Sequence, residues 1–222
     1  MNVNKIEDKK IISKGKYSKC YELESGSVLK IFNKPQSLTE IDKFRYMLKY
    51  KNENFLFPID FVYDDKKFYG YIVKKAIGNP IKDVFSSSNL EELASHSAVL
   101  EKNISKISKG RILVDNFHEG NIMYNGKKFE VIDTDFYQAP VPFSPKEIKS
   151  DNLTHYRFII SRLLNENLKY SEDTKYVIEQ VRKYVCKNLL PSDMIMLIKE
   201  DIEDYCKEEI NTLDDFQKII RR

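Results

Sequence analysis

The sequence lacks tryptophan altogether and has only three cysteines among its 222 residues. Cys20, Cys186 and Cys206 are too few and too widely spaced for a disulfide framework or a zinc-binding cluster, so reduced thiols and a cytoplasmic location are expected. Internal repeats and low-complexity tracts are also missing. This leaves an ordinary globular protein of one domain or one two-lobed unit.

A strong charge excess and a long apolar run are missing as well. The 37 basic and 34 acidic residues leave a net charge of +3, and this balance argues against a nucleic-acid partner. The first residues, MNVNKIEDKK, are polar and mixed in charge, unlike a signal peptide. The strongly apolar stretch Phe158–Leu164 is interrupted by Ser161 and Arg162, so no membrane segment is expected.

The chain does contain enough apolar bulk for a core, and its pattern changes along its length. Hydrophobic residues make up 41% of it, including 13 Phe and 14 Tyr. In the first third, runs typical of β-strands cover residues 11–23, 27–32, 55–62 and 68–75. One helix is expected there from Ser37 to about Lys51, because Leu38, Ile41, Phe44 and Leu48 follow helical spacing.

The remainder is mainly helical. Helices are expected at 90–107 and at roughly 151–167, 171–188, 192–208 and 212–221, with short β-like runs at 111–114, 121–124 and 129–133. We therefore predict an α+β, two-lobed fold. A small antiparallel sheet with one helix would occupy residues 1–76, and a mainly helical part would occupy residues 77–222.

Three polar residues border short apolar runs in the second part. Asp115 and Asp133 each follow such a run, and Asn121 precedes one. A hairpin through Asn125-Gly126 would bring Asn121 and Asp133 to the same end of two paired strands. Oxygen ligands placed there suit Mg²⁺, which usually keeps several waters. Each residue taken alone is an ordinary turn or cap residue, and only their common order points to a site.

The run Asp115-Asn116-Phe117-His118-Glu119-Gly120-Asn121, followed by Ile132-Asp133, resembles the catalytic loop and metal-binding aspartate of the protein-kinase-like superfamily. That superfamily includes eukaryotic-type protein kinases and aminoglycoside phosphotransferases. The resemblance implies a phosphotransferase that uses ATP and Mg²⁺, with Asn121 and Asp133 as metal ligands. The acceptor would be a hydroxyl group of a protein or of a small molecule. Asp135 falls where many small-molecule kinases of the superfamily carry an acidic residue.

The spacing of this loop departs from the family pattern, Asp-x-x-x-x-Asn. Counting back from Asn121, the aspartate position holds Asn116 and not Asp115. One interpretation is that the loop contains one extra residue and Asp115 is the catalytic base; we favour it because Asp115 follows a short strand, as the family's aspartate does. The other is that the base is lost, because an amide cannot accept the proton.

The first part offers matching nucleotide-binding residues. The segment Ile12–Tyr21 resembles the glycine-rich loop of these kinases, with Gly15 at the middle glycine position and Ser18 at an outer one; a plain β-hairpin is the alternative. Lys30 interrupts an apolar strand, so it reaches outward to solvent or points into a site. In the resembled family this lysine contributes to catalysis by gripping the phosphates and pairs with a helix glutamate, for which Glu40 is the candidate.

The resemblance assigns three further roles. The connector between the lobes would be Tyr71–Gly78, and its backbone at Lys74 and Ala76 would hydrogen-bond adenine, with Cys20 beside the ring. Asp151 resembles the aspartate that braces the catalytic loop, although a helix N-cap explains it equally well. His118 is expected to be a structural hydrogen-bonding residue of the loop.

Two functions follow from these expectations. The first is an active ATP-dependent phosphotransferase, in which Asp115 orients the acceptor hydroxyl and Lys30 and Mg²⁺ neutralise phosphate charge. The second is a pseudokinase that keeps the nucleotide pocket and has Asn116 at the base position. A helical interaction protein without nucleotide would make the order of Lys30, Asn121 and Asp133 a coincidence.

Overall fold

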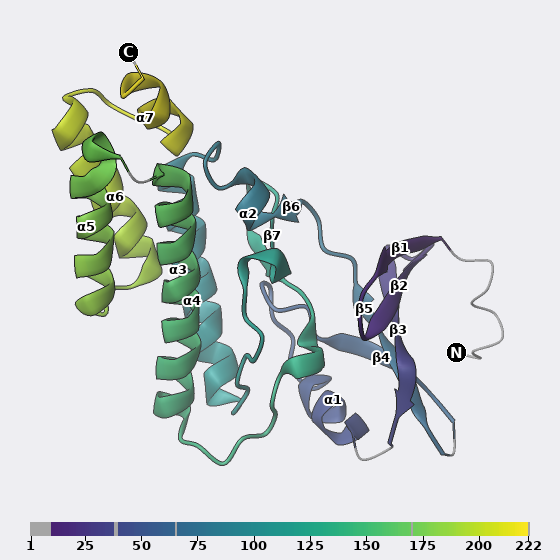
Figure 1. Cartoon of the computed structure of the whole chain (residues 1–222). Coiled ribbons are helices and arrows are strands. Elements are labelled where there is room, and N and C mark those ends of the chain that lie inside the picture. The colour runs from purple at the N-terminus through teal and green to yellow at the C-terminus, as the bar shows by residue number, and fades with distance from the viewer. Residues whose placement is uncertain (1–9, 38–39, 65, 170, 222) are drawn as a thin grey trace.

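The computed structural model describes residues 10–37, 40–64, 66–169 and 171–221 and shows an α+β fold. The first part is a five-stranded antiparallel sheet with the strand order β1-β2-β3-β5-β4 (Figure 1). Its strands are β1 Ile11–Lys14, β2 Ser18–Leu23, β3 Ser27–Gln36, β4 Pro58–Tyr63 and β5 Phe68–Lys74. The helix α1, Ile41–Met47, is shorter than the helix predicted from residue 37 to 51, and Leu38 of that prediction lies outside the described residues.

Alternation along the strands separates two faces of the sheet. On the inner face, Phe32, Phe68 and Tyr71 pack around Phe44 of α1, with ring centroids 5.2–6.4 Å apart. On the outer face a small separate cluster forms around two buried residues, Leu29 and Val62, with Tyr21, Leu23, Ile31, Tyr69 and Ile72 against them. Because Leu29 and Ile31 face outward, Lys30 between them is directed inward.

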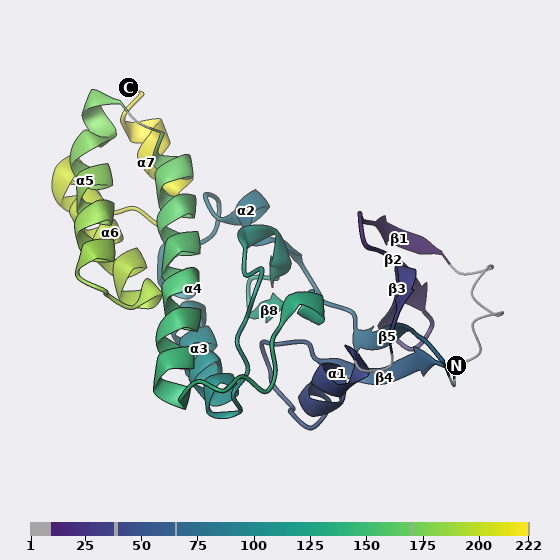
Figure 2. The same cartoon turned by 60° about the horizontal axis from the view of Figure 1, so that its bottom comes forward.

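The second part combines a small sheet with the helices. Its three strands, in the order β6-β7-β8, are β6 Asn79–Pro80, β7 Ile122–Tyr124 and β8 Phe129–Val131. The helices are α2 Ile81–Val84, α3 Leu90–Lys109, α4 Pro145–Leu168, α5 Glu172–Cys186, α6 Pro191–Cys206 and α7 Leu213–Ile219. Helix α3 packs against α4 and α6, and α5 packs against both α4 and α6 (Figure 2).

Caps explain where these helices differ from the prediction. Helix α3 begins after Asn89, whose side chain accepts hydrogen bonds from two backbone amides, and ends at Gly110. Helix α4 begins at Pro145, earlier than the predicted 151, because Ser144 and Glu147 form a capping box. The β-like run at 111–114 is not a strand, since only Leu113 bridges to another segment, at Gln138.

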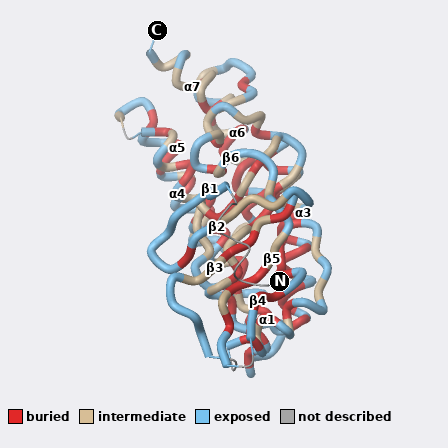
Figure 3. The backbone as a smooth tube through the Cα atoms, turned by 90° about the vertical axis from the view of Figure 1, so that its right-hand side faces the viewer, coloured by how far each residue is buried: buried red, intermediate tan, exposed pale blue. Residues whose placement is uncertain are grey.

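The two parts are joined by paired backbone as well as by a shared core. Asn54 precedes β4, yet its carbonyl accepts the amide of Val131 in β8 at 2.6 Å, and Leu56 donates back to Val131 at 3.0 Å. The Asn54 side chain is bound by Asn103 of α3 at 2.6 Å and donates to Phe129 at 2.6 Å. Residues 54–58, where these contacts lie, are all buried, and buried segments occur in both the sheet and the helices (Figure 3).

A fully buried carboxylate fixes the connector between the two parts. Glu130 in β8 has no exposed surface; it accepts the amide of Ile77 at 2.9 Å and pairs with Lys128 at 2.5 Å and Lys74 at 3.7 Å. Desolvation is the largest influence and raises the pKa of Glu130, but Lys128, the Ile77 amide and Lys74 together lower it below its ordinary value. Glu130 therefore remains ionised and holds the connector against β8.

We expect Glu130→Ala to lower the free energy of unfolding by about 2–3 kcal/mol, because it leaves the Ile77 amide unpaired and removes a paired buried charge. Urea denaturation measures this, with the exposed glutamate variant Glu53→Ala as the control. The stabilisation is complete above the ordinary pKa of 4.5 and is lost as the pH falls through the lower pKa of the folded protein. The difference from wild type should therefore narrow in acid, and a constant difference would contradict the charged role.

Candidate active site

A hairpin brings two of the expected metal ligands together. Strands β7 and β8 pair in antiparallel register through Asn125-Gly126, where Gly126 has a φ of 79°. The amide of Ile132 donates to the carbonyl of Asn121 at 2.9 Å. Asn121 and Asp133 consequently lie at the same end of two paired strands, which confirms the hairpin predicted from the sequence.

Lys30 reaches this end of the hairpin from the sheet and contacts two carboxylates. Its Nζ lies 2.5 Å from Asp133 Oδ1 and 2.7 Å from Asp135 Oδ2, and only 10% of its side chain is exposed. Tyr71 stands opposite Lys30 in the register of β3 and β5, and its hydroxyl donates to Asp135 Oδ1 at 2.6 Å. The sheet and the segment after β8 are thus connected through one buried ammonium group.

Burial and the neighbouring charges shift the pKa values of Lys30 and Asp135 in opposing directions. Burial is the largest influence and lowers the pKa of Lys30, but the charges of Asp135 and Asp133 together hold that pKa above its ordinary value. Burial raises the pKa of Asp135; Lys30 opposes this rise and Asp133 reinforces it. Lys30 is therefore a permanent cation at neutral pH, and the two carboxylates beside it compensate its charge.

The expected pair between Lys30 and Glu40 is wrong. Half of the Glu40 side chain is exposed, and its carboxylate faces Lys43 at 3.9 Å. Lys43 also donates to the backbone carbonyl of Asp135 at 2.5 Å. The physical reason is that Asp133 and Asp135 already occupy the Lys30 ammonium at short distance, while Lys43, three residues along α1, is the nearer cation for Glu40.

Asp133 has an unusual backbone conformation. Its φ of 65° and ψ of 68° lie in the left-handed region, which residues other than glycine rarely adopt. This conformation is held by the structure on both sides, since Asp133 follows β8 and precedes the 3-10 turn Thr134–Phe136. Strained residues of this kind concentrate at functional sites.

The loop before Asn121 contains Asp115 and Asn116, the two candidates for the position of the base. The Asp115 carboxylate is exposed and accepts hydrogen bonds from its neighbour's amide at 2.9 Å and from Gln138 Nε2 at 3.2 Å. Asn116 has a φ of 57°, and its carbonyl accepts from Asn121 Nδ2 at 3.3 Å. The side-chain amide of Asn121 is thus tied to Asn116, which leaves its Oδ1 oxygen for a cation.

Two contacts that the sequence did not indicate support this loop. Glu119 forms an ion pair with Arg162 of α4. Asn152, buried in the same helix, accepts from the Val114 amide at 2.8 Å and donates to the Ile112 carbonyl at 3.0 Å. The bracing role considered for Asp151 therefore belongs to Asn152, because Asp151 is on the exposed face of α4.

His118 stabilises the loop from within. Its Nδ1 accepts the Gly120 amide at 3.1 Å, as expected for a structural residue. Burial lowers the pKa of His118, with the charge of Asp133 acting in the opposite direction. A Cβ at Gly120 would approach the imidazole ring to 3.0 Å, so glycine allows the ring to pack there.

The β1–β2 turn lies at the tip of the sheet. The amide of Gly15 donates to the carbonyl of Ser18 at 2.8 Å, and Asn33 of β3 donates to the carbonyls of Gly15 and Lys16. Ser18 is buried in β2, and Cys20 lies directly opposite Lys30 in the β2–β3 register. Gly15, Ser18 and Cys20 thus lie on the hairpin that adjoins Lys30.

Lys74, Ala76 and Ile77 of the connector differ in their contacts. Lys74 is exposed, and its ammonium lies 3.7 Å from Glu130 rather than in the Lys30 cluster. The amide of Ile77 is taken by Glu130. Within the described part of the chain, the backbone N–H and C=O of Ala76 form no hydrogen bond. The backbone donor and acceptor of Ala76 are therefore unpaired within the described residues.

The donor set suits a metal that is shared with a ligand. Among the described residues, no three His, Cys, Asp or Glu side chains cluster so that they could hold a metal ion. Asn121 and Asp133 supply oxygen atoms, and the Asp133 side chain is 27% exposed. Mg²⁺ is commonly bound by one or two carboxylates together with substrate phosphates, so these residues fit Mg²⁺ only in company with a phosphate ligand.

Comparison with known proteins adds no assignment, since no family model and no curated protein matches the chain. None of the helices within the described residues has the length and apolar character to cross a membrane.

We expect Lys30→Met to lower the free energy of unfolding by about 3 kcal/mol, because the two carboxylates lose their shared cation in a largely buried place. Chemical denaturation measures the loss, and Lys19→Met, at an exposed lysine of β2, is the control. Adding Asp135→Asn to Lys30→Met should restore part of the stability by removing one unpaired charge. A Lys30→Met protein as stable as wild type would contradict the cluster.

Proposed function

We propose that the chain is a protein-kinase-like phosphotransferase that binds ATP with Mg²⁺ and passes the γ-phosphate to a hydroxyl acceptor. The observation that carries this proposal is the Lys30 ammonium held between Asp133 and Asp135, beside Asn121. A buried cation, a carboxylate and an amide oxygen at one point are the groups that phosphoryl transfer requires.

Asp135 and Asp133 would have different roles, the first in holding Lys30 and the second in binding the metal. Asp135 is 11% exposed and is also bound by Tyr71, so it would anchor Lys30 in the role first expected of Glu40. Asp133 is more accessible and is free of other side-chain hydrogen bonds among the described residues. Asp133 would exchange its contact with Lys30 for the metal when nucleotide enters, and Lys30 would then bind phosphate oxygens.

The remaining parts of the nucleotide have candidate partners. The free backbone groups of Ala76 would bind adenine beside Cys20, and the amides of the β1–β2 turn near Gly15 would approach the phosphates. Mg²⁺ would supply neutralisation of the phosphate charge. This arrangement uses residues from both parts of the fold, so nucleotide should stabilise the whole protein.

For transfer, Asp115 is the proposed base. Its carboxylate would accept the proton of the acceptor hydroxyl while that oxygen bonds to the γ-phosphorus. The bond between the γ-phosphorus and the bridging oxygen would break, and ADP would leave. The exposed position of Asp115 leaves its carboxylate accessible to an acceptor, which would displace the hydrogen bond from Gln138.

A second function is favoured by one specific contact. Asn121 donates to Asn116, the residue five positions before it, and so engages the position that the family spacing assigns to the base. If Asn116 holds that position, the chain is a pseudokinase that binds nucleotide without transferring phosphate.

Asp133→Asn tests the metal site. In wild type, ATP with Mg²⁺ should raise the melting temperature more than ATP alone, and Mg²⁺ alone should have little effect because phosphate completes its ligands. Asp133→Asn should abolish the part that depends on Mg²⁺, whereas Asp204→Asn, at an exposed aspartate of α6, should not. Thermal denaturation with each ligand measures this. An unchanged Mg²⁺ effect in Asp133→Asn would place the metal elsewhere.

Asp115→Asn tests the base. Turnover with labelled ATP should fall by roughly 10²-fold or more, the usual scale for a positioned acid–base group, while ATP affinity stays nearly unchanged. Asn116→Ala should have a mild effect. The reverse ranking would show that the register is wrong. Absence of turnover with every acceptor tried, in a protein that binds ATP, would favour the pseudokinase.

A further inference from the structure

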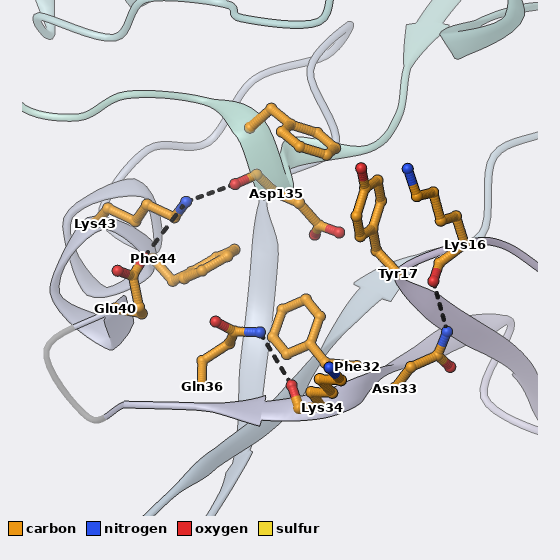
Figure 4. A pocket seen from close by; sticks show the side chains of 11 residues that line it. Lys16, Tyr17, Phe32, Asn33, Lys34, Gln36, Glu40, Lys43, Phe44 and Asp135 are labelled. Atoms are coloured by element: carbon orange, nitrogen blue, oxygen red, sulfur yellow. Dashed lines mark hydrogen bonds and ion pairs between the residues drawn. The ribbon is translucent and has the colours of Figure 1, made fainter.

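A cavity of about 470 Å³ lies beside the proposed nucleotide site (Figure 4). It is enclosed by the tip of the β1–β2 hairpin, the end of β3, the start of α1 and the turn after Asp133. Its lining comprises Lys16, Tyr17, Phe32, Asn33, Lys34, Gln36, Glu40, Lys43, Phe44, Asp135 and Phe136. Asp135 is the wall that the cavity shares with the Lys30 cluster, and neither Lys30 nor Asp133 lines it.

Aromatic rings form the walls. Tyr17 and Phe136 meet edge to face with centroids 5.9 Å apart, and Phe32 and Phe44 lie 6.4 Å apart. Figure 4 shows the labelled rings of Tyr17, Phe32 and Phe44 around a common space. Tyr17 is 56% exposed and Phe136 is 39% exposed, so the rings at the mouth are left open to solvent. Such walls suit a planar apolar group.

The charged side chains of the cavity differ in whether they form ion pairs. Asp135 is engaged by Lys30 and Tyr71, and Glu40 faces Lys43. Lys16 and Lys34, in contrast, form no ion pair with any residue of the described ranges. The carboxylates of the cavity are therefore compensated, whereas Lys16 and Lys34 are exposed cations that are available to an anion at the cavity.

We propose that this cavity binds a small aromatic anion, a planar ring system that carries a carboxylate, at a site separate from the nucleotide. The ring would lie between Phe32 and the pair Tyr17 and Phe136, and the carboxylate would be directed to Lys16 and Lys34. The cavity volume is within the range of small-molecule sites, and an apolar wall with a few polar groups at its edge is their usual composition. The proposal does not depend on nucleotide binding.

Naphthoate is a suitable probe, and naphthamide is its uncharged match. Because the chain has no tryptophan, the fluorescence of the bound naphthyl group can be followed with little interference from the protein. The full chain should bind naphthoate saturably and more tightly than naphthamide. Lys16→Gln with Lys34→Gln should weaken naphthoate binding by about tenfold and leave naphthamide unchanged, since two charge contacts are lost. The control variant, Lys19→Gln, should behave as wild type.

A second variant tests the cavity itself. Gln36→Phe at the exposed end of β3 should weaken both probes, because the larger side chain fills part of the space and adds no tryptophan signal, and thermal denaturation verifies that it folds. Equal affinity for naphthoate in wild type and in the double lysine variant would overturn the proposal, as would no saturable binding at all. Binding should persist with saturating ATP and Mg²⁺. Complete displacement of naphthoate by nucleotide would overturn a separate site and assign the cavity to the nucleotide cleft.

Discussion

One buried ammonium group connects the sheet of this protein to the segment that follows the β7–β8 hairpin. Lys30 comes from the sheet, and Asp133 and Asp135 come from the segment that follows β8, more than a hundred residues later. A lysine buried to this degree is costly unless it is paired, and two carboxylates so close to each other are costly unless a cation lies between them. Each group therefore offsets the cost of burying the others, and under the proposed function Asp133 would have to release Lys30 before that ammonium could bind a phosphate.

Much of the neighbouring structure serves to hold Asp135. Its carboxylate is bound by Lys30 and Tyr71, and its carbonyl is bound by Lys43 of α1. Helix α1 is thus attached to the turn after Asp133 through its own lysine and not through Glu40. The same attachment leaves open space between α1, the end of β3 and the hairpin tip, which is the cavity lined by aromatic rings. Asp135 thus belongs both to the ion-pair cluster with Lys30 and to the wall of the cavity.

Binding and transfer place different demands on the loop 115–121. Binding needs Asn121 beside Asp133, and the β7–β8 hairpin provides this through backbone hydrogen bonds. Transfer would need a carboxylate aimed at an acceptor, and among the residues that the structure describes the Asp115 carboxylate accepts hydrogen bonds only from Gln138 and the Asn116 amide. The support given by Asn152 and by the Glu119–Arg162 pair positions the loop backbone. The residues of the proposed nucleotide site are therefore held by more contacts than the candidate base.

The sequence by itself determined which neighbouring residues lie on opposite faces of β3 and which residues the β7–β8 hairpin pairs, but not that Lys30 points inward, nor that residues 111–114 before Asp115 form no strand. Strand alternation placed Lys30 opposite to Leu29 and Ile31, and the Asn125-Gly126 turn paired Asn121 with Asp133; both are local patterns that need only a few neighbouring residues. Only the tertiary structure decided the partners. Lys30 selects Asp133 and Asp135 over Glu40, and Asn152 braces the loop in place of Asp151, because such choices depend on distance and desolvation between segments far apart in the chain. Neither quantity is encoded in spacing along the sequence.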